Sequence, residues 1–217
     1  MREQYERWLR GWTPVSLYVR WYLRHGGARY APPLFAAMRR VELPRVLDVG
    51  CATGFYLLWA FEHGLGAEIL AGIDVSPQLL SEAARRLEDA TRAGANVELL
   101  EASATALPFA DGSFDAVLCN GVVKYLDDAA LSEFLREARR VLAPGGCIAV
   151  ADFGRPIAIQ TTLFPPKRFG IPTDHLRTAD ELRSALTGHG FVGVRDVPLK
   201  RLRRIPLTYE GAVGVRA

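Results

Sequence analysis

Two turns in the first half of the chain carry residue types whose spacing could bind a nucleoside. The segment VLDVGCATG (residues 46–54) ends an apolar run with a turn that holds Gly50 and Gly54, and glycine lets a ligand approach the backbone closely. Asp74 comes 20 residues after Gly54, at the end of a second apolar run. A carboxylate there can accept hydrogen bonds from both hydroxyls of a ribose, and each charge-assisted bond contributes roughly 1.5 to 3 kcal/mol. The spacing therefore predicts a nucleoside site.

The glycine pattern distinguishes between two classes of nucleotide site. Dinucleotide-binding turns carry three glycines in the pattern G-x-G-x-x-G. This chain has G-x-x-x-G, with Asp48 two residues before the first glycine. A carboxylate at that place would repel a pyrophosphate, but it suits the cationic amino group of a methionine moiety. The pattern favours S-adenosylmethionine over a nicotinamide cofactor.

These turns need a scaffold, and the rest of the sequence indicates which one. From residue 45 onward, short apolar runs typical of strands alternate with segments of helical spacing, which is typical of βαβ units around a parallel sheet. We expect strands at 45–50, 69–74, 97–100, 115–120, 147–152, 191–197 and about 207–215. We expect helices at 55–63, 76–94, 129–142 and 178–189, with a turn at 144–146. The predicted fold class is α/β: a Rossmann-like, doubly wound, mostly parallel seven-stranded sheet with an antiparallel edge strand and an N-terminal helical appendage.

The first 40 residues differ in composition from the rest. They hold eight arginines against Glu3 and Glu6, and aromatic residues lie among the arginines. Thr13-Pro14 could begin a helix that Gly26-Gly27 ends. We therefore expect a helical appendage or lid at 1–40 and one catalytic domain at 41–217.

Four separated stretches resemble, in order, a class I S-adenosylmethionine-dependent methyltransferase of the small-molecule type, similar to quinone-biosynthesis and natural-product enzymes. They are VLDVGCATG, GIDVSPQLL, ALPFADGSFDAVLCN and LREARRVLAPGGCIAVAD. A weaker fifth stretch is HLRTADELRSALTGHGF. The resemblance covers about 150 residues, from 45 to 195, and leaves the first 40 unexplained.

The resemblance implies that the turn after the first strand holds the methionine portion of the cofactor. The residues concerned are Asp48, Gly50, Cys51 and Gly54. Ala52 stands where a glycine is common in the family, so this turn departs from the usual pattern at one position.

The resemblance also implies contacts for the nucleoside and the sulfonium. Asp74 would bind the ribose, Val75 would cover one face of the adenine, and Asn120 would lie near the sulfonium. Relatives usually carry an aspartate where this chain has Ser103, so Ser103 and the backbone of Ala104 are weaker candidates for the adenine amino group.

Methyl transfer from a sulfonium depends largely on positioning, and a general base is needed only for some acceptors. Lys124, Tyr125 and Asp152 lie near the ends of the expected fourth and fifth strands, and His175 lies in a later loop beside Asp174. His175 is our first candidate for a base, with Lys124 and Tyr125 as further catalytic candidates. The alternative interpretation of Lys124 is a solvated charge at a helix entry.

The sequence indicates the methyl acceptor less clearly than it indicates the cofactor. Residues 153–177 interleave apolar side chains with prolines, which is typical of a semi-rigid apolar lid and favours a small, partly apolar acceptor. The basic, aromatic N-terminal segment could instead contact RNA or a membrane surface. An RNA acceptor is disfavoured, because the Cys119-Asn120-Gly121-Val122 segment lacks the N-P-P-aromatic signature and the body of the chain is acidic. A non-catalytic S-adenosylmethionine-binding protein is the remaining alternative.

The composition of the chain indicates the cellular compartment in which we expect it. The N-terminus lacks a signal-peptide pattern, and the longest apolar run, 55–61, is too short to cross a bilayer. Three well-separated cysteines suit a reducing compartment, so we expect a cytoplasmic protein. The four histidines and three cysteines lack metal-ligand spacing, and no metal is expected.

Overall fold

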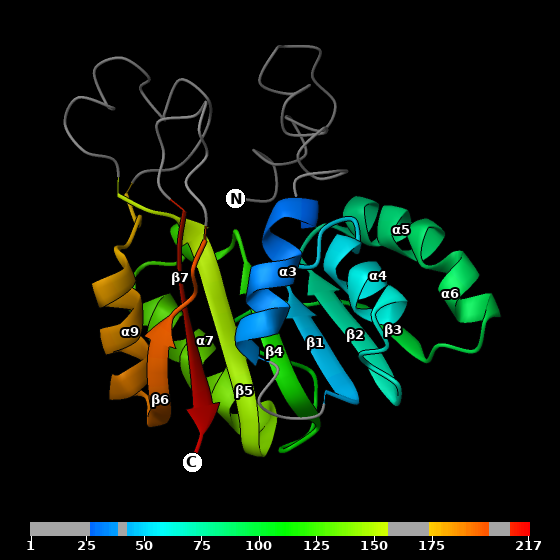
Figure 1. Cartoon of the computed structure of the whole chain (residues 1–217). Coiled ribbons are helices and arrows are strands. Elements are labelled where there is room, and N and C mark those ends of the chain that lie inside the picture. Colours follow the sequence, from blue (N-terminus) through cyan, green and yellow to red (C-terminus); the bar gives the residue numbers. More distant parts are fainter. Residues whose placement is uncertain (1–26, 39–42, 156–173, 200–208) are drawn as a thin grey trace.

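A seven-stranded sheet forms the centre of the computed structural model, which describes residues 27–38, 43–155, 174–199 and 209–217 (Figure 1). The strand order is β3-β2-β1-β4-β5-β7-β6. Neighbouring strands pair in parallel except at β7, which is antiparallel to both β5 and β6. The predicted doubly wound sheet is confirmed. The strands are β1 (Arg45–Val49), β2 (Ile69–Asp74), β3 (Val97–Glu101), β4 (Phe114–Asn120), β5 (Leu142–Phe153), β6 (Phe191–Asp196) and β7 (Tyr209–Arg216).

Helices cover both faces of the sheet, so each face has its own apolar core. One core joins α3 and α4 to the sheet, and the other joins α7 and α9 to the opposite face. The helical elements are α3 (Gly27–Met38), α4 (Phe55–Glu62), α5 (Pro77–Arg86), α6 (Glu88–Arg92), the 3-10 helix η2 (Val123–Tyr125), α7 (Asp128–Val141) and α9 (Ala179–Gly188).

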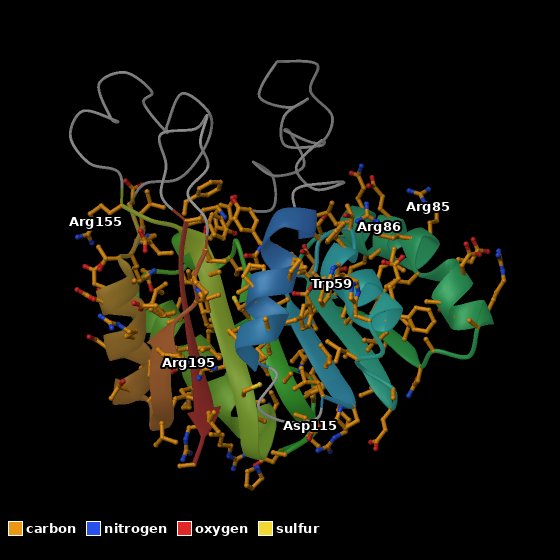
Figure 2. All side chains as sticks on the ribbon, in the orientation of Figure 1. Trp59, Arg85, Arg86, Asp115, Arg155 and Arg195 are labelled. Atoms are coloured by element: carbon orange, nitrogen blue, oxygen red, sulfur yellow. The ribbon has the colours of Figure 1, made fainter. Side chains whose placement is uncertain are left out.

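An ion pair at the amino end of the parallel strands sets the register of β1 against β4. The Arg45 guanidinium contacts the Asp115 carboxylate at 2.6 Å, and the Arg45 backbone N–H donates to the same carboxylate at 3.1 Å. Asp115 lies at the strand ends opposite to the start of α3 (Figure 2). This pairing aligns the carboxyl ends of both strands at the other end of the sheet.

Two expected boundaries were wrong. The helix expected over 76–94 divides at Leu87 into α5 and α6, although its predicted start is confirmed because the Ser76 hydroxyl accepts the Leu79 N–H at 3.4 Å. The turn expected at 144–146 is part of β5 instead. Gly146 makes this possible, because a side chain there would begin 2.9 Å from the Ala143 carbonyl and 3.0 Å from the Asp115 carbonyl.

Helix α3 belongs to the apolar core that joins α3 and α4 to the sheet. Tyr30, Leu34, Phe35 and Met38 are each at most 1% exposed. The Phe35 ring stacks on Trp59 of α4 at 4.8 Å, and Trp59 is labelled in Figure 2. The helix expected at 13–26 lies outside the described residues, as does most of the apolar lid expected at 153–177.

Within the described ranges, the helices are too short or too polar to span a bilayer. The same residues hold no cluster of three histidine, cysteine or acidic side chains that could bind a metal ion. Cys51, Cys119 and Cys147 are buried free thiols.

Candidate functional site

The candidate site lies where the carboxyl ends of β2, β1 and β4 meet. Strand β1 lies between β2 and β4, so the chain leaves β1 toward one side of the sheet and later returns on the other (Figure 1). In open α/β sheets this switch point opens a crevice that binds ligands. Asp48, Asp74 and Asn120 come from these three strands, so the topology brings together residues that the sequence separates by up to 72 positions.

The turn after β1 has a left-handed backbone at three positions. Gly50, Ala52 and Gly54 have φ values of 75°, 48° and 73°. A side chain at Gly50 would begin 2.2 Å from a methyl carbon of Val122, in the turn after β4. Only glycine allows the two turns to approach this closely, which explains Gly50 in packing terms.

Asp74 fixes the β1 turn against the end of β2. Its carboxylate accepts the Ala52 N–H at 3.0 Å and the Ser76 N–H at 2.9 Å. Burial raises the pKa of Asp74, while the N–H groups of Ser76, Ala52 and Val75 oppose the rise. The carboxylate has four lone pairs in all, so it keeps acceptor capacity for a ligand hydroxyl.

Asp48 is buried beside the same turn, and its carboxylate does not make all the hydrogen bonds that it could. It is 1% exposed, and its Oδ2 has no hydrogen-bond partner within the part of the chain that the structure describes. Burial, together with the charge of Asp74, raises the Asp48 pKa to about 8. An unpartnered buried carboxylate is costly, and a cationic ligand group would relieve that cost.

The residues expected around an adenine lie beside Asp74. Val75 is 40% exposed, so part of its apolar side chain is open to contact with a ligand. Strand β3 ends with Glu101 opposite Asp74, and Ser103 and Ala104 follow in the loop. The Ser103 hydroxyl bonds the Thr105 hydroxyl at 2.8 Å and accepts the Thr105 N–H at 3.2 Å, so this loop has its own local support.

Asn120 ends β4 and has a partner that the sequence did not predict. Its Oδ1 accepts the Tyr209 O–H at 2.7 Å. Tyr209 begins β7 and pairs with Phe153 at the end of β5. No local motif identifies Tyr209, because only the antiparallel pairing brings it across the sheet. The expected strand at 207–215 is the one signal that pointed to it.

Lys124 is buried, so its interpretation as a solvated charge was wrong. It is 7% exposed, and its ammonium contacts the Asp152 carboxylate at 3.2 Å and the Gly121 carbonyl. The ammonium also lies 4.5 Å from the centre of the Tyr125 ring and 5.7 Å from that of Phe153. Asp152, 2% exposed, accepts the Lys124 backbone N–H at 2.9 Å as well. The pair ties the turn after β4 to the end of β5.

Tyr125 is half-buried beside this ion pair. Burial raises its phenol pKa, and the negative charges of Asp152 and Asp74 raise it further. A phenol in this environment stays protonated at neutral pH, so Tyr125 can donate a hydrogen bond but is poorly suited to act as a base.

His175 lies in a segment that a buried arginine holds against η2. The Arg177 guanidinium donates to the Val123 carbonyl and to the Leu126 carbonyl, each at 2.9 Å, and to the His175 carbonyl at 3.0 Å. His175 is half-buried. The structure therefore places the His175 segment against the turn that carries Lys124 and Tyr125, and sequence reasoning missed Arg177.

Comparisons with known proteins agree on the class of domain. Residues 46–146 match the family described as a methyltransferase domain. The chain is 42% identical over 113 residues to the demethylmenaquinone methyltransferase of Thermus thermophilus, covering 52% of this chain and 48% of that protein. It is 38% identical over 152 residues to an O-methyltransferase of Aspergillus nomiae, covering 68% of this chain and 64% of that protein. The crystal structure of an S-adenosylmethionine-dependent methyltransferase from Thermotoga maritima, a possible histamine N-methyltransferase, aligns over 100% of both chains with a TM-score of 0.69 and 22% identity.

These likenesses differ in what they cover. The chain spans about half the length of the Thermus protein that it matches. The likeness to the Thermotoga structure concerns the fold, since the two sequences are 22% identical. The family match at 46–146 includes Asp48, Asp74 and Asn120, so it covers the three strand ends of the candidate site.

Proposed function

We propose, from the premise that this chain carries a class I S-adenosylmethionine-dependent methyltransferase domain, that the protein transfers a methyl group to a small, partly apolar acceptor. One observation carries the proposal. A buried carboxylate oxygen of Asp48, which has no partner among the residues that the structure describes, lies beside a glycine turn that Asp74 holds in place. When bound, S-adenosylmethionine supplies an electrophilic methyl group on a positively charged sulfur.

The donor set fits this cofactor. Asp48 would bind the methionine amino group, which is a cation that matches its unpartnered oxygen. The backbone of the turn from Gly50 through Cys51 to Gly54 would line the rest of the methionine portion.

The nucleoside would extend from that turn toward β3. Asp74 would accept the ribose hydroxyls with its remaining lone pairs, and the exposed face of Val75 would cover the adenine. Ser103 and Ala104 would border the adenine edge. The Ser103 hydroxyl already bonds Thr105, so it would bind the adenine amino group more weakly than a free aspartate would.

The acceptor would lie beyond Asn120, toward the ends of β4 and β5. Two of the polar groups there carry no net charge, because Asp152 offsets the Lys124 charge, and the Tyr125 phenol stays protonated. An uncharged acceptor fits this environment better than a phosphorylated or strongly cationic one. The quinone substrate in the name of the Thermus relative is consistent with an acceptor of this kind.

Three residues are candidates for roles in catalysis. His175 is the candidate base for a hydroxyl or activated carbon acceptor, and Tyr125 is a candidate hydrogen-bond donor to it. Lys124 contributes by holding the turn after β4 in place through Asp152.

The test is calorimetric titration with S-adenosylmethionine, followed by a methyl-release assay on a panel of quinols, phenols, amines and RNA. We expect binding of the cofactor and turnover on a small apolar acceptor. Turnover on RNA alone would mean that the acceptor is RNA and not a small apolar molecule. Tight binding without turnover on any acceptor would favour a non-catalytic cofactor-binding protein.

A further inference from the structure

An ion pair on α7 holds the loop that joins β3 to β4 (residues 102–113). Glu137 is 8% exposed, and each of its carboxylate oxygens accepts a hydrogen bond from the Arg140 guanidinium at 2.9 Å. The same carboxylate accepts the Leu107 N–H at 3.0 Å, and Arg140 donates to the Leu107 carbonyl at 3.0 Å. The hydrogen bond from Arg140 lowers the pKa of Glu137, so the carboxylate stays ionised at neutral pH. The pair therefore binds both backbone groups of one loop residue.

Arg140 also holds the following part of the loop. Its guanidinium donates to the Phe109 carbonyl at 2.8 Å and to the Asp111 carboxylate at 2.7 Å. The Arg140 carbonyl accepts the Gly112 N–H at 3.0 Å. A planar fork with five donors can make these bonds together, so the loop backbone cannot shift against α7 without breaking several of them.

The start of the loop lies beside Asp74. The Ala102 N–H donates to the Asp74 carbonyl at 3.2 Å, directly after the end of β3. The Ala106 N–H then donates to the Ser103 carbonyl at 3.1 Å, which closes a turn over residues 103–106. This turn is therefore attached to Asp74 at one end and to the Glu137–Arg140 pair at the other.

We propose that Glu137 and Arg140 are positioning residues that determine which base is accepted on a nucleoside bound at Asp74. This inference rests on the proposed function, in which Asp74 accepts the ribose hydroxyls and the 103–106 turn borders the adenine. The Ser103 hydroxyl already bonds the Thr105 hydroxyl, so recognition of the base edge falls on the backbone of the turn. The pair on α7 holds that backbone in one position.

The hydrogen-bond pattern of the base makes this role measurable. Adenine presents an NH2 donor beside a ring nitrogen that accepts, whereas hypoxanthine presents a carbonyl oxygen beside an N–H donor. A turn held in one position pairs with one of these patterns and leaves unpaired polar groups against the other. A turn released from α7 can shift to reduce the mismatch, so its release should lower the preference for adenine.

The experiment measures, by calorimetry on the full chain, the affinities for S-adenosylhomocysteine and S-inosylhomocysteine, which carries hypoxanthine in place of adenine. We expect the wild-type protein to prefer the adenine ligand at least about tenfold. Arg140→Gln removes the charged fork and should reduce this preference to about threefold or less. Arg140→Lys keeps the charge but lacks the fork, so it should reduce the preference as well.

Arg136→Gln is the matched control on the same helix. Within the part of the chain that the structure describes, the ion pairs of Arg136 are with Glu133 and Glu137, so they stay on α7. This variant should keep the wild-type preference. Thermal unfolding checks that each variant is folded, and Arg140→Lys provides the test if Arg140→Gln does not fold, because it keeps a cation beside Glu137.

Three results would overturn the inference alone. The first is a folded Arg140 variant that loses affinity for both ligands equally, which would leave the pair a structural role only. The second is an equal loss of preference in Arg136→Gln, and the third is a wild-type protein that binds both ligands equally well. If the wild-type protein bound neither ligand, the proposed function would fall together with this inference.

Discussion

Among single residues, Asp48 is the one whose protonation state we expect to depend most on a bound ligand. Its pKa of about 8 in the free protein results from burial and from the charge of Asp74. At neutral pH the carboxyl is therefore largely protonated before a ligand binds. A cationic ligand group beside it favours the ionised form and lowers its pKa in the complex.

This difference predicts proton release on cofactor binding. Below the free-protein pKa, the complex holds fewer protons than the free protein, so affinity for S-adenosylmethionine should rise as the pH increases toward about 8. Calorimetry at about pH 7 in buffers of different ionisation enthalpy should report release of nearly one proton. Asp48→Asn should abolish the release. Affinity that stayed constant across this range in the wild-type protein would contradict the assignment.

Ala52 is a second residue that allows a test, because its backbone conformation should lower the stability of the fold. Its φ of 48° lies in the left-handed region, where an L-residue with a side chain costs roughly 1 to 2 kcal/mol. Ala52→Gly should therefore leave the protein as stable as before or increase the free energy of unfolding by up to about 1 kcal/mol, because glycine's greater freedom in the unfolded chain offsets part of the gain.

Denaturant unfolding measures this change, and Ala93→Gly is the matched control. Ala93 has a φ of −78°, so glycine relieves no strain there and should lower stability. Equal losses in both variants would mean that the Ala52 turn stores no strain.

At the scale of elements, the Lys124–Asp152 pair joins β5 to the turn after β4. Both side chains are less than one-tenth exposed, so removing one charge leaves the other buried and uncompensated. Lys124→Met should lower the free energy of unfolding by about 3 to 5 kcal/mol. Urea denaturation measures the loss.

The exposed Arg136–Glu133 pair on α7 provides the comparison for this prediction. Its side chains are 60% and 53% exposed, and exposed pairs contribute at most about 1 kcal/mol. Arg136→Met should therefore change stability little. If Lys124→Met cost no more than Arg136→Met, the pair would not tie the two elements together.

Helix α3 is expected to unfold with the sheet rather than separately from it. Leu34 is fully buried between α3 and the core, so Leu34→Ala should cost about 2 to 5 kcal/mol in the free energy of unfolding. Val192→Ala on β6, where the side chain is 50% exposed, should cost far less. A separate, earlier transition for Leu34→Ala, with the main transition unshifted, would show that α3 folds independently.

At the scale of the whole molecule, the sequence predicted the sheet well because the strands depend on local patterns, while the residues of the cofactor site stay a prediction. The runs at 45–50 and 69–74 are mostly apolar, as is usual for strands covered on both faces, and the acidic Asp48 and Asp74 stand out within them. The β5 boundary was missed because Gly145 and Gly146 usually mark a turn, whereas here both lie within a strand, and Gly146 allows the close packing there.

The parts that the sequence did not predict depend on contacts between distant residues. Lysine is rarely buried, and the partner that makes its burial possible, Asp152, is 28 positions from Lys124. Tyr209 is 89 positions from Asn120, and no spacing rule links a tyrosine at one strand end with an asparagine at another. These two pairs needed the three-dimensional arrangement to be found.

The most direct test of the account is the affinity of the Asp74→Ala variant for S-adenosylmethionine, measured by calorimetry. Asp74 both supports the β1 turn and offers its remaining lone pairs to the ribose, so we expect affinity to fall at least about tenfold. Asp89→Ala, which removes an exposed carboxylate from α6, should bind like the wild-type protein. A folded Asp74→Ala variant with unchanged affinity would contradict the proposed cofactor site.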